Sequence, residues 1–279
     1  MGQTERVKEW GAPRLIGVPW DKSSSYKRGA ADAPGPIREA LRSDATNTTT
    51  ELGVDIGRPG SYDDAGDLEL PEDTEQAFAK IEKTVEGILE ERRRPVILGG
   101  DHSITYPVLR AFGKRFKDLT LIHFDAHPDL YDNYDDNRYS HASPFARVME
   151  DKLTKRLIQV GIRCMTSHQK KQAAKFGVEV FGIGHERALE EVKTWCPVYV
   201  SFDMDVLDPA FAPGVSHREP GGMTVREVLD HLHSITAAIV GADIVEYNPS
   251  RDVSDLTATV AAKVLKELLG KMVAECKCP

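Results

Sequence analysis

Residues 119–129 read LTLIHFDAHPD, an apolar run that ends in alternating polar side chains. Asp125, His127 and Asp129 occupy every second position of its last part. Because alternate residues of an extended chain point to the same side, one strand end presents two carboxylates and an imidazole together. The stretch therefore predicts a buried strand whose end carries ligands for a metal ion.

Two more stretches have the same plan, GGDHS at 99–103 and SFDMDVLDP at 201–209, and they add His102, Asp203 and Asp205. A lone pair of aspartates in a loop would more often form a turn or a helix cap. Here three clusters each follow an apolar run, and ligands of open α/β sheets bind beyond the carboxyl ends of the strands. Four carboxylates and two imidazoles are more than one cation needs, so the pattern indicates two divalent ions that share bridging carboxylates.

The apolar runs alternate with helical patterns along the chain. Because most runs are apolar at successive positions, they are typical of strands buried between two layers of helices. The candidate strands are Arg14–Val18, Pro95–Leu98, Leu119–Phe124, Leu157–Ile162, Pro197–Asp203 and Ile239–Glu246. Apolar stripes indicate helices over 72–91, 224–235 and from Ser254 onward. The region 43–71 is the least periodic, and its stretches 47–50 and 57–60 are expected to be loop. This alternation predicts an α/β fold with a largely parallel sheet.

Composition places the chain among ordinary globular proteins, with 41% hydrophobic and 29% charged residues. No repeat or linker divides it, so residues 1–279 are expected to form one domain. The net charge of -8 argues against a nucleic-acid partner, which would require a basic face. The sequence has neither an apolar run of about 18 residues nor an apolar N-terminal signal, so we expect a cytoplasmic enzyme without a membrane partner. Its four cysteines are too few for a disulfide framework, and Cys276 and Cys278 are expected in an exposed tail.

Other polar residues lie near the predicted strand ends. His141 follows a polar loop that begins beside the first cluster, where an acid–base group is expected. Glu246 closes the last apolar run and either caps a turn or anchors a cationic substrate, while Asp243 in the same run is expected to be a structural hydrogen-bond partner. His217 and Glu219 lie on a glycine-rich loop and are expected to line the mouth of the pocket.

Two residues beside the clusters have roles that the sequence leaves open. His123 precedes the alternating set and either belongs to the core or supports a ligand. Asp101 is expected to cap the helix that begins near Ser103, or to belong to the tight turn after the strand.

The motifs GGDHS, DAHPD, SFDMDVLDP and GADIVEYNP, in this order, resemble the ureohydrolase family of arginases, agmatinases and their relatives. The resemblance runs from about Gly17 to Lys271. The stretches DAHPDLYD, SHASPFARVME and APGVSHREPGG look most like the plant-type arginase/agmatinase branch. The resemblance implies a three-layer α/β/α fold around a parallel sheet of about eight strands, and assembly into a homo-oligomer, a trimer or hexamer.

The resemblance also implies two Mn²⁺ ions per subunit, with Co²⁺ or Ni²⁺ as substitutes. Carried over by motif, the first ion would be bound by His102, Asp125, Asp129 and Asp203. The second would be bound by Asp125, His127, Asp203 and Asp205. Asp125 and Asp203 would then bridge the two ions.

The activity implied by the resemblance is metal-assisted hydrolysis of a guanidino group to urea and an amine. Asp129 would orient the attacking water, and Glu246 would pair with the cationic guanidinium group of the substrate. His141 would carry a proton to the leaving amine.

The residues that would contact the rest of the substrate depart from the animal arginases. Those proteins carry an asparagine two residues past the last aspartate of the DxHxD motif and a serine four residues before the catalytic histidine. Here the two positions hold Tyr131 and Asn137. Tyr131 also fits agmatinase-like sequences, so arginine and agmatine both stay open, and the plant-type pattern favours arginine. Tyr131, Asn137 and His217 are the candidate contacts.

Three alternatives to this function stay open. One is another hydrolase on this scaffold, such as a guanidinobutyrase, guanidinase or formiminoglutamase. A second is a non-catalytic sensor of arginine or polyamines. The presence of both His141 and Glu246 argues against it. A third is a deacetylase on the related fold, which uses one zinc and would not need both Asp129 and Asp205.

Overall fold

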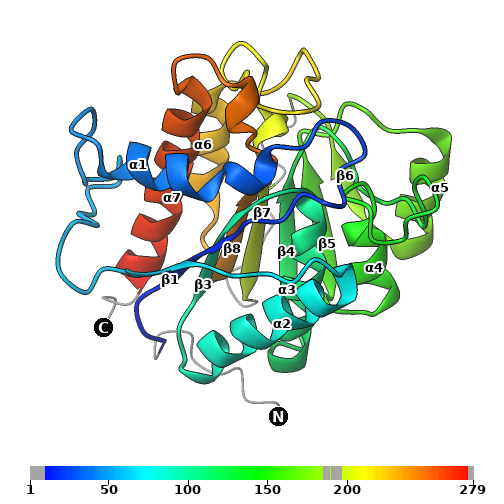
Figure 1. The fold of residues 1–279 in the computed structure, drawn as a ribbon, viewed down its shortest axis with the longest axis horizontal. Coiled ribbons are helices and arrows are strands. Elements are labelled where there is room, and N and C mark those ends of the chain that lie inside the picture. The colour runs from blue at the N-terminus through cyan, green and yellow to red at the C-terminus, as the bar shows by residue number, and fades with distance from the viewer. Residues whose placement is uncertain (1–9, 185–188, 190–196, 276–279) are drawn as a thin grey trace.

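The computed structural model describes residues 10–184, 189 and 197–275, so Cys196, Cys276 and Cys278 lie outside the described part. The described strands form one sheet of eight parallel strands in the order β2-β1-β3-β8-β7-β4-β5-β6. They are β1 (Arg14–Val18), β2 (Asp63–Asp67), β3 (Pro95–Gly99), β4 (Thr120–Phe124), β5 (Arg156–Val160), β6 (Glu179–Phe181), β7 (Val198–Asp203) and β8 (Ile239–Val245). The last two strands, β7 and β8, therefore lie in the middle of the sheet (Figure 1).

The four central strands, β3, β8, β7 and β4, end level with one another. Leu98 of β3 pairs with Ile244 of β8, which pairs with Phe202 of β7, and that residue pairs with Phe124 of β4. The three motif clusters and Glu246 all begin within a few residues of this row. Parallel pairing of the central strands thus brings them to one edge of the sheet.

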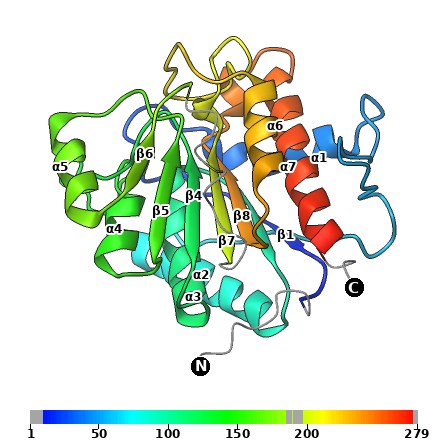
Figure 2. The ribbon, with the colours of Figure 1, turned by 180° about the vertical axis from the view of Figure 1, so that it is seen from behind.

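Helices cover both faces of the sheet (Figure 1, Figure 2). One layer consists of α1 (Pro34–Arg42), α6 (Val225–Ser234) and α7 (Leu256–Glu275), and the other of α2 (Thr74–Glu90), α3 (Thr105–Arg115), α4 (Pro144–Glu150) and α5 (Ser167–Phe176). Short 3-10 turns lie between these elements, namely η2 (Ala30–Asp32), η3 (His102–Ile104), η4 (Met204–Val206) and η5 (Pro249–Arg251). The described residues form the three-layer α/β/α arrangement that was predicted.

Each face of the sheet has its own apolar core, because successive side chains of a strand point to opposite faces. In β4, Leu121 packs among residues of α2, α3 and α4, whereas Ile122 and Phe124 pack among residues of α1, α6 and α7. All three side chains are fully buried. Burying a side chain of this size stabilises the fold by about 1.5–3 kcal/mol. Burial on both faces explains why the strands are visible in the sequence as continuous apolar runs.

The sequence-based elements agree with the structure in the interior and differ at the edges. All six candidate strands are present, and Thr224 caps α6 through a capping box with Glu227. Within the least periodic region, 43–71, the structure adds the edge strand β2 at Asp63–Asp67. Its sequence DDAGD is partly to fully exposed, and its aspartates pair with arginines of other elements instead of joining a core. The opposite edge strand, β6, and the helices α1, α4 and α5 are likewise additions to the prediction, whereas the helix expected from near Ser103 is present as η3 and α3.

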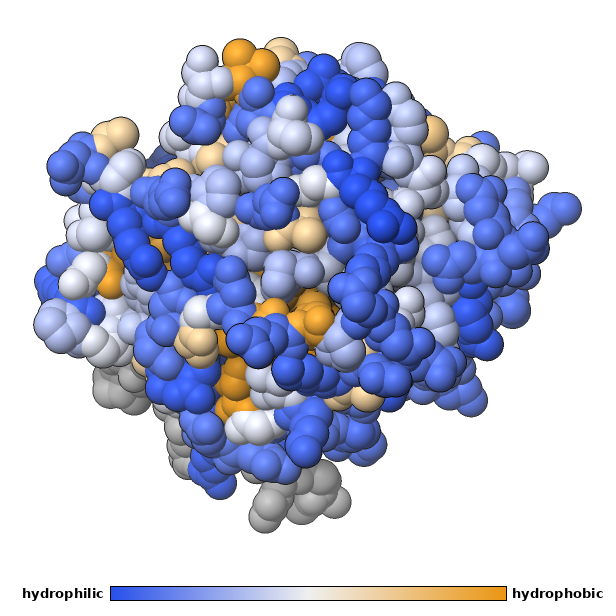
Figure 3. Space-filling model, viewed as in Figure 1, coloured by the Kyte–Doolittle hydropathy of each residue, from blue (hydrophilic) through white to orange (hydrophobic). Residues whose placement is uncertain are grey.

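The surface is that of an ordinary globular protein. Among the described residues, no helix is long and apolar enough to cross a bilayer. The face in Figure 3 is mostly hydrophilic, and apolar side chains appear on it in small separate groups. Scattered apolar residues of this kind are normal on protein surfaces.

Candidate metal centre

The imidazole of His102 faces three carboxylates at the ends of the central strands. Its Nδ1 lies 3.2 Å from an oxygen of Asp125, 3.2 Å from one of Asp129 and 3.1 Å from one of Asp203. The four side chains are at least nine-tenths buried, and Nδ1 has no hydrogen-bond partner among the described residues. An octahedral ion with bonds of about 2.1 Å separates neighbouring ligands by roughly 3 Å. Each of the three oxygens thus lies at the distance from Nδ1 that separates neighbouring ligands of one metal ion.

The opposite nitrogen of His102 is held by a buried relay. Nε2 lies 2.9 Å from Ser201 Oγ, and Ser201 Oγ donates to Asp243 at 2.7 Å. Tyr199 and Thr105 donate to the other oxygen of Asp243, at 2.8 and 2.9 Å. Because Ser201 gives its proton to Asp243, its oxygen accepts from His102 Nε2–H, and Nδ1 stays available for a metal ion. Asp243 is the structural partner that the sequence predicted, and Ser201 is an addition.

A second group of ligand atoms lies beside the first. His127 Nδ1 is 3.0 Å from Asp205 Oδ2 and 3.4 Å from Asp125 Oδ1, so Asp125 directs one oxygen to each group. Backbone hydrogen bonds fix the neighbouring oxygens, since Ala126 N–H donates to Asp205 Oδ1 and Asp205 N–H donates to Asp203 Oδ1. The structure thus brings all six predicted metal ligands together.

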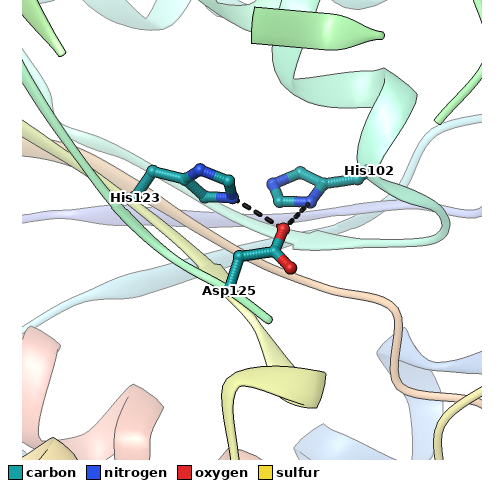
Figure 4. A group of neighbouring side chains, drawn as sticks. All are labelled: His102, His123 and Asp125. Atoms are coloured by element: carbon teal, nitrogen blue, oxygen red, sulfur yellow. Dashed lines mark hydrogen bonds and ion pairs between the residues drawn. The ribbon is translucent and has the colours of Figure 1, made fainter. Parts of the chain in front are cut away.

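His123 supports the shared carboxylate from the core side. Its Nε2 lies 2.7 Å from Asp125 Oδ2, the same oxygen that faces His102 (Figure 4). The amide nitrogen of Gln159 donates to Pro128 O at 2.6 Å and lies 3.1 Å from Nδ1 of His123. Nδ1 is therefore the acceptor, and Nε2–H donates to Asp125. Burial lowers the pKa of His123 and keeps this ring neutral.

The cluster concentrates negative charge in a buried place, and the pKa values of Asp203, Asp205 and His102 rise in response. Burial, with the charges of Asp205 and Asp125, raises the pKa of Asp203 well above its usual range. Burial also raises the pKa of Asp205 to about 6. Burial alone would lower the pKa of His102, but the surrounding carboxylates raise it well above its ordinary value. Divalent cations would displace these protons, because metal ligands must be deprotonated.

The donor set fits divalent metal ions. Asp125, His127 and Asp205 place ligand atoms within 4.8 Å of one another, next to the group around His102. Carboxylate and imidazole ligands without a thiolate suit Mn²⁺ and similar ions. The unpartnered Nδ1 of His102 among three carboxylate oxygens is the observation that carries the assignment of a metal site.

His141 and Glu246 form an ion pair beside this cluster. Nδ1 of His141 lies 2.8 Å from Glu246 Oε1, which also accepts the backbone N–H of His102 at 2.8 Å. Burial alone would lower the pKa of His141, but the charge and hydrogen bond of Glu246 raise it to about 9. Burial would raise the pKa of Glu246, but His141 and the backbone of His102 lower it. The pair can therefore hold a proton on the imidazole next to the metal cluster.

The loop after β1 closes this part of the site. Ser25 approaches the other ring nitrogen of His141, with its N–H at 3.1 Å and its Oγ at 2.8 Å from Nε2. Asp101 fixes the loop by accepting Ser23 N–H at 2.9 Å and Ser24 Oγ at 3.2 Å, and it caps η3 as predicted. A run of serines looks the same in a sequence whether it lines a site or forms an ordinary loop, so these contacts are not predicted from the sequence.

Comparison with known proteins agrees with this geometry. Residues 12–270 match the arginase family. The chain is 45% identical over 274 residues to the protein named Arginase 1, mitochondrial, of Arabidopsis thaliana, a match that covers 92% of this chain and 80% of the relative. The chain belongs to the arginase family. It is also 34% identical to an agmatinase of Bacillus cereus, over 91% of this chain and 90% of that protein. The structure of the arginase from Medicago truncatula is similar with a TM-score of 0.88, at 43% identity, over 94% of this chain and 87% of the other.

Two carboxylates of this arginase-family site lie on strained backbone. Asp129 has a φ of 48° and Glu246 a φ of 63°, in the left-handed region that favours glycine. Such conformations cost about 1–3 kcal/mol each and persist where the surrounding structure enforces them. The fold thus maintains a sharp turn directly beyond β8 and in the loop beyond β4, and both turns carry a predicted catalytic carboxylate.

Two of the predicted contacts to the substrate tail lie on the loop that follows the first cluster. Tyr131 stacks on His168 with ring centroids 5.6 Å apart, and its hydroxyl donates to Thr166 at 3.3 Å. Asn137 accepts the N–H of Tyr139 at 2.9 Å and so shapes the loop itself. Their role in substrate binding stays a prediction.

His217 lies closer to the reactive groups of this arginase-family member. Its ring centroid is 5.3 Å from that of His141 and 6.0 Å from that of His127. Tyr26 packs on it with the ring centroids 5.5 Å apart. Burial and the charge of His141 lower the pKa of His217. Among the three predicted tail contacts, His217 is the one beside both the metal cluster and the ion pair.

Proposed function

We propose that the protein hydrolyses the guanidino group of L-arginine to L-ornithine and urea. The observation that carries this proposal is the buried cluster around His102 next to the His141–Glu246 pair. Membership in the arginase family supports hydrolysis with release of urea. The 45% identity to a plant arginase, against 34% to an agmatinase, supports arginine as the substrate.

The proposed cofactor is a pair of Mn²⁺ ions per subunit, with Co²⁺ or Ni²⁺ as substitutes. The two sets of residues that would hold them are His102, Asp125, Asp129 and Asp203, and Asp125, His127, Asp203 and Asp205. Two such ions would supply Lewis acidity and lower the pKa of water at the site. Ser201 and His123 would keep the ligands in orientation through the hydrogen bonds described above.

The side chains beside the cluster would orient the substrate and supply a proton to its leaving amine. Both hydrogen bonds to Glu246 use Oε1, so Oε2 is the oxygen that we assign to the guanidinium group. A charge-assisted bond there would fix the guanidinium carbon against the attacking water, which Asp129 would orient. His141 would donate its ring proton to the leaving amine.

Recognition of the rest of the substrate falls to the residues on the outer side of the cluster. His217 is the candidate that lies beside His141 and His127, and Tyr131 and Asn137 complete the predicted set. Agmatine, which lacks the carboxylate of arginine, is the second candidate substrate. Tyr131 favours it, because this residue also fits agmatinase-like sequences.

A urea-release assay after Mn²⁺ loading tests the proposal, with arginine, agmatine and 4-guanidinobutyrate side by side. We expect the highest kcat/KM with arginine and a loss of at least about 100-fold in Glu246→Gln, because the charge that fixes the guanidinium is removed. The exposed Glu75→Gln serves as the matched control and should leave the rate unchanged. Faster turnover of another compound would reassign the substrate. Binding of arginine without release of urea would favour the alternative of a non-catalytic arginine sensor.

We further propose a homo-oligomer, a trimer or hexamer, and a cytoplasmic location. The first rests on the family resemblance, and light scattering of the purified protein measures it. The Arabidopsis relative is named mitochondrial, so a mitochondrial location is the alternative for the second. Fluorescence microscopy of a C-terminally tagged chain distinguishes the two.

A further inference from the structure

A different group of ligand atoms lies on the outer side of His127. A ring nitrogen of His127, the Sγ of Cys164 and a carboxylate oxygen of Glu219 all lie within 4.8 Å of one another. Nε2 is the nitrogen that faces Glu219, at 3.7 Å from Oε1, whereas Nδ1 faces Asp205 at 3.0 Å. The two nitrogens of one imidazole thus point toward two separate sets of donors.

Hydrogen bonds hold together the segments that carry these donors. Cys164 N–H and Arg163 N–H both donate at 3.0 Å to the carbonyl oxygen of Ala126, the residue before His127. The guanidinium of Arg163 donates to the carbonyl oxygen of Glu219, from Nη2 at 2.6 Å and from Nε at 3.1 Å. Nη2 of Arg163 also donates at 2.7 Å to the carbonyl oxygen of Asp205, just after β7. The loops that follow β4, β5 and β7 are thereby fixed to one another, and the three donors start close together before any ligand arrives.

The chemistry of this group differs from that of the inner cluster. A thiolate, an imidazole and a carboxylate suit Zn²⁺ and other thiophilic ions, whereas ligands that are all oxygen and imidazole suit Mn²⁺. Cys164 is exposed, and the side chains of Glu219 and His127 are 37% and 22% exposed. An ion bound here would have three protein ligands and a fourth position open to water, as zinc sites with three protein ligands do.

We propose that His127, Cys164 and Glu219 form an outer cation site that takes Zn²⁺ or an ion of similar softness. On binding, the S–H bond of Cys164 breaks, its proton passes to solvent and the sulfur–metal bond forms. A ring bound through Nε2 carries its remaining proton on Nδ1, which faces Asp205 and then no longer serves the inner cluster. Binding at the outer site and metal ligation by His127 in the inner cluster therefore exclude each other, and a thiophilic ion inhibits the enzyme.

Co²⁺ tests the thiolate ligand directly, because cobalt–thiolate coordination has a charge-transfer absorption in the near ultraviolet. The sample is the full chain with Cys196, Cys276 and Cys278 replaced by serine, so that Cys164 is its one thiol, and it is freed of metal beforehand. The proposed ligands of the inner cluster include no thiolate, so only Co²⁺ at the outer site gives the band. We expect a band that saturates with Co²⁺, that Zn²⁺ abolishes, and that is lost on adding Cys164→Ser. A chain that shows no saturable band overturns the proposal.

Glu219→Gln separates a three-donor site from a lone thiol. We expect the dissociation constant of Co²⁺ to rise by about tenfold or more, with Glu75→Gln as the matched control that leaves it unchanged. An affinity unchanged by Glu219→Gln overturns the assignment of Glu219 and with it the site.

Inhibition of urea release supplies an independent readout. Zn²⁺ should inhibit the wild type, and Cys164→Ser should keep its activity and escape inhibition at the same Zn²⁺ concentration. Equal inhibition of both proteins would place the inhibitory ion elsewhere and overturn the proposal. If no variant releases urea from any guanidino compound, the proposed function fails, while the absorption titration still decides the outer site.

Discussion

Replacing Ser201 by alanine would remove the relay behind His102 while leaving every proposed metal ligand in place. Ser201 is fully buried, and its Oγ lies 2.9 Å from His102 Nε2 and 2.7 Å from Asp243. The change leaves two buried polar groups short of a partner, at about 1–3 kcal/mol each. Because Tyr199 and Thr105 still donate to Asp243, we expect the lower end, a loss of about 2–3 kcal/mol in the free energy of unfolding.

The effect of Ser201→Ala on metal binding follows from the freed imidazole. Without its partner, His102 can place its proton on Nδ1, the atom that faces the three carboxylates. Groups that orient a metal ligand contribute about 10- to 100-fold to affinity, or roughly 1.4–2.8 kcal/mol. Isothermal titration calorimetry at fixed pH should show a Mn²⁺ dissociation constant raised by this factor, and saturating Mn²⁺ should restore most of the urea release.

Thr105→Val is the matched control for this experiment. It removes another donor to Asp243, at 2.9 Å, but Thr105 bonds to the oxygen that does not face Ser201. We expect a similar loss of stability and an unchanged affinity for Mn²⁺. The reasoning is refuted if Ser201→Ala binds Mn²⁺ as tightly as the wild type, or if Thr105→Val weakens binding to the same extent.

Three further predictions concern the inner cluster, the turn beside it and a distant buried carboxylate. Asp203→Asn removes a charge that we propose to bridge two ions, so metal-dependent urea release should fall by at least about 100-fold; retained turnover with full metal occupancy would contradict the assignment. Gly100→Ala would place a Cβ 1.8 Å from the carbonyl oxygen of Trp20, so denaturant unfolding should show a loss of about 3 kcal/mol or more, whereas Gly87→Ala, which has open space, should not. The side chain of Glu267 is fully buried; burial would raise its pKa, but contacts with a lysine and a histidine lower it. A carboxylate with a lowered folded pKa contributes stability that is present above the unfolded value of about 4.3 and is lost as the pH falls through the folded pKa. The difference in the free energy of unfolding between the wild type and E267Q should therefore be widest near neutral pH and narrow below about pH 4. A difference that is constant from about pH 7 to pH 3 would disprove this.

The interior of the fold is readable from the sequence because burial on both faces produces uninterrupted apolar runs. The run that ends at Phe124 is one such case, since its successive side chains enter two different cores. The edge strand β2 gives no such signal. Its sequence DDAGD pairs with β1 through the backbone, and its aspartates form ion pairs with Arg14 and Arg38. These partners come from other elements, so a local pattern does not contain them.

The site divides in the same way between local and distant information. The proposed ligands are readable because each lies next to the end of an apolar run, and three of them alternate in one short motif. Two of the supporting serines are not, since Ser201 is 99 positions from His102 and Ser25 is 116 positions from His141. Serines at such separations become meaningful only after the parallel strands have brought their ends together. The outward packing of Tyr131 on His168 is likewise set by α5, an element that the sequence pattern does not reveal.

The central place of β7 and β8 has a consequence for the order in which the protein is made. Ribosomes release β1 to β6 first, as two half-sheets, β2-β1-β3 and β4-β5-β6, whose strands share no ladder hydrogen bonds with each other. His102 belongs to one half and Asp125 to the other. Until the chain has been synthesised past β8, β3 and β4 each expose an unpaired edge, which invites association with other nascent chains. We therefore expect the metal to enter only the completed chain, and products that end before β7 to aggregate instead of binding manganese.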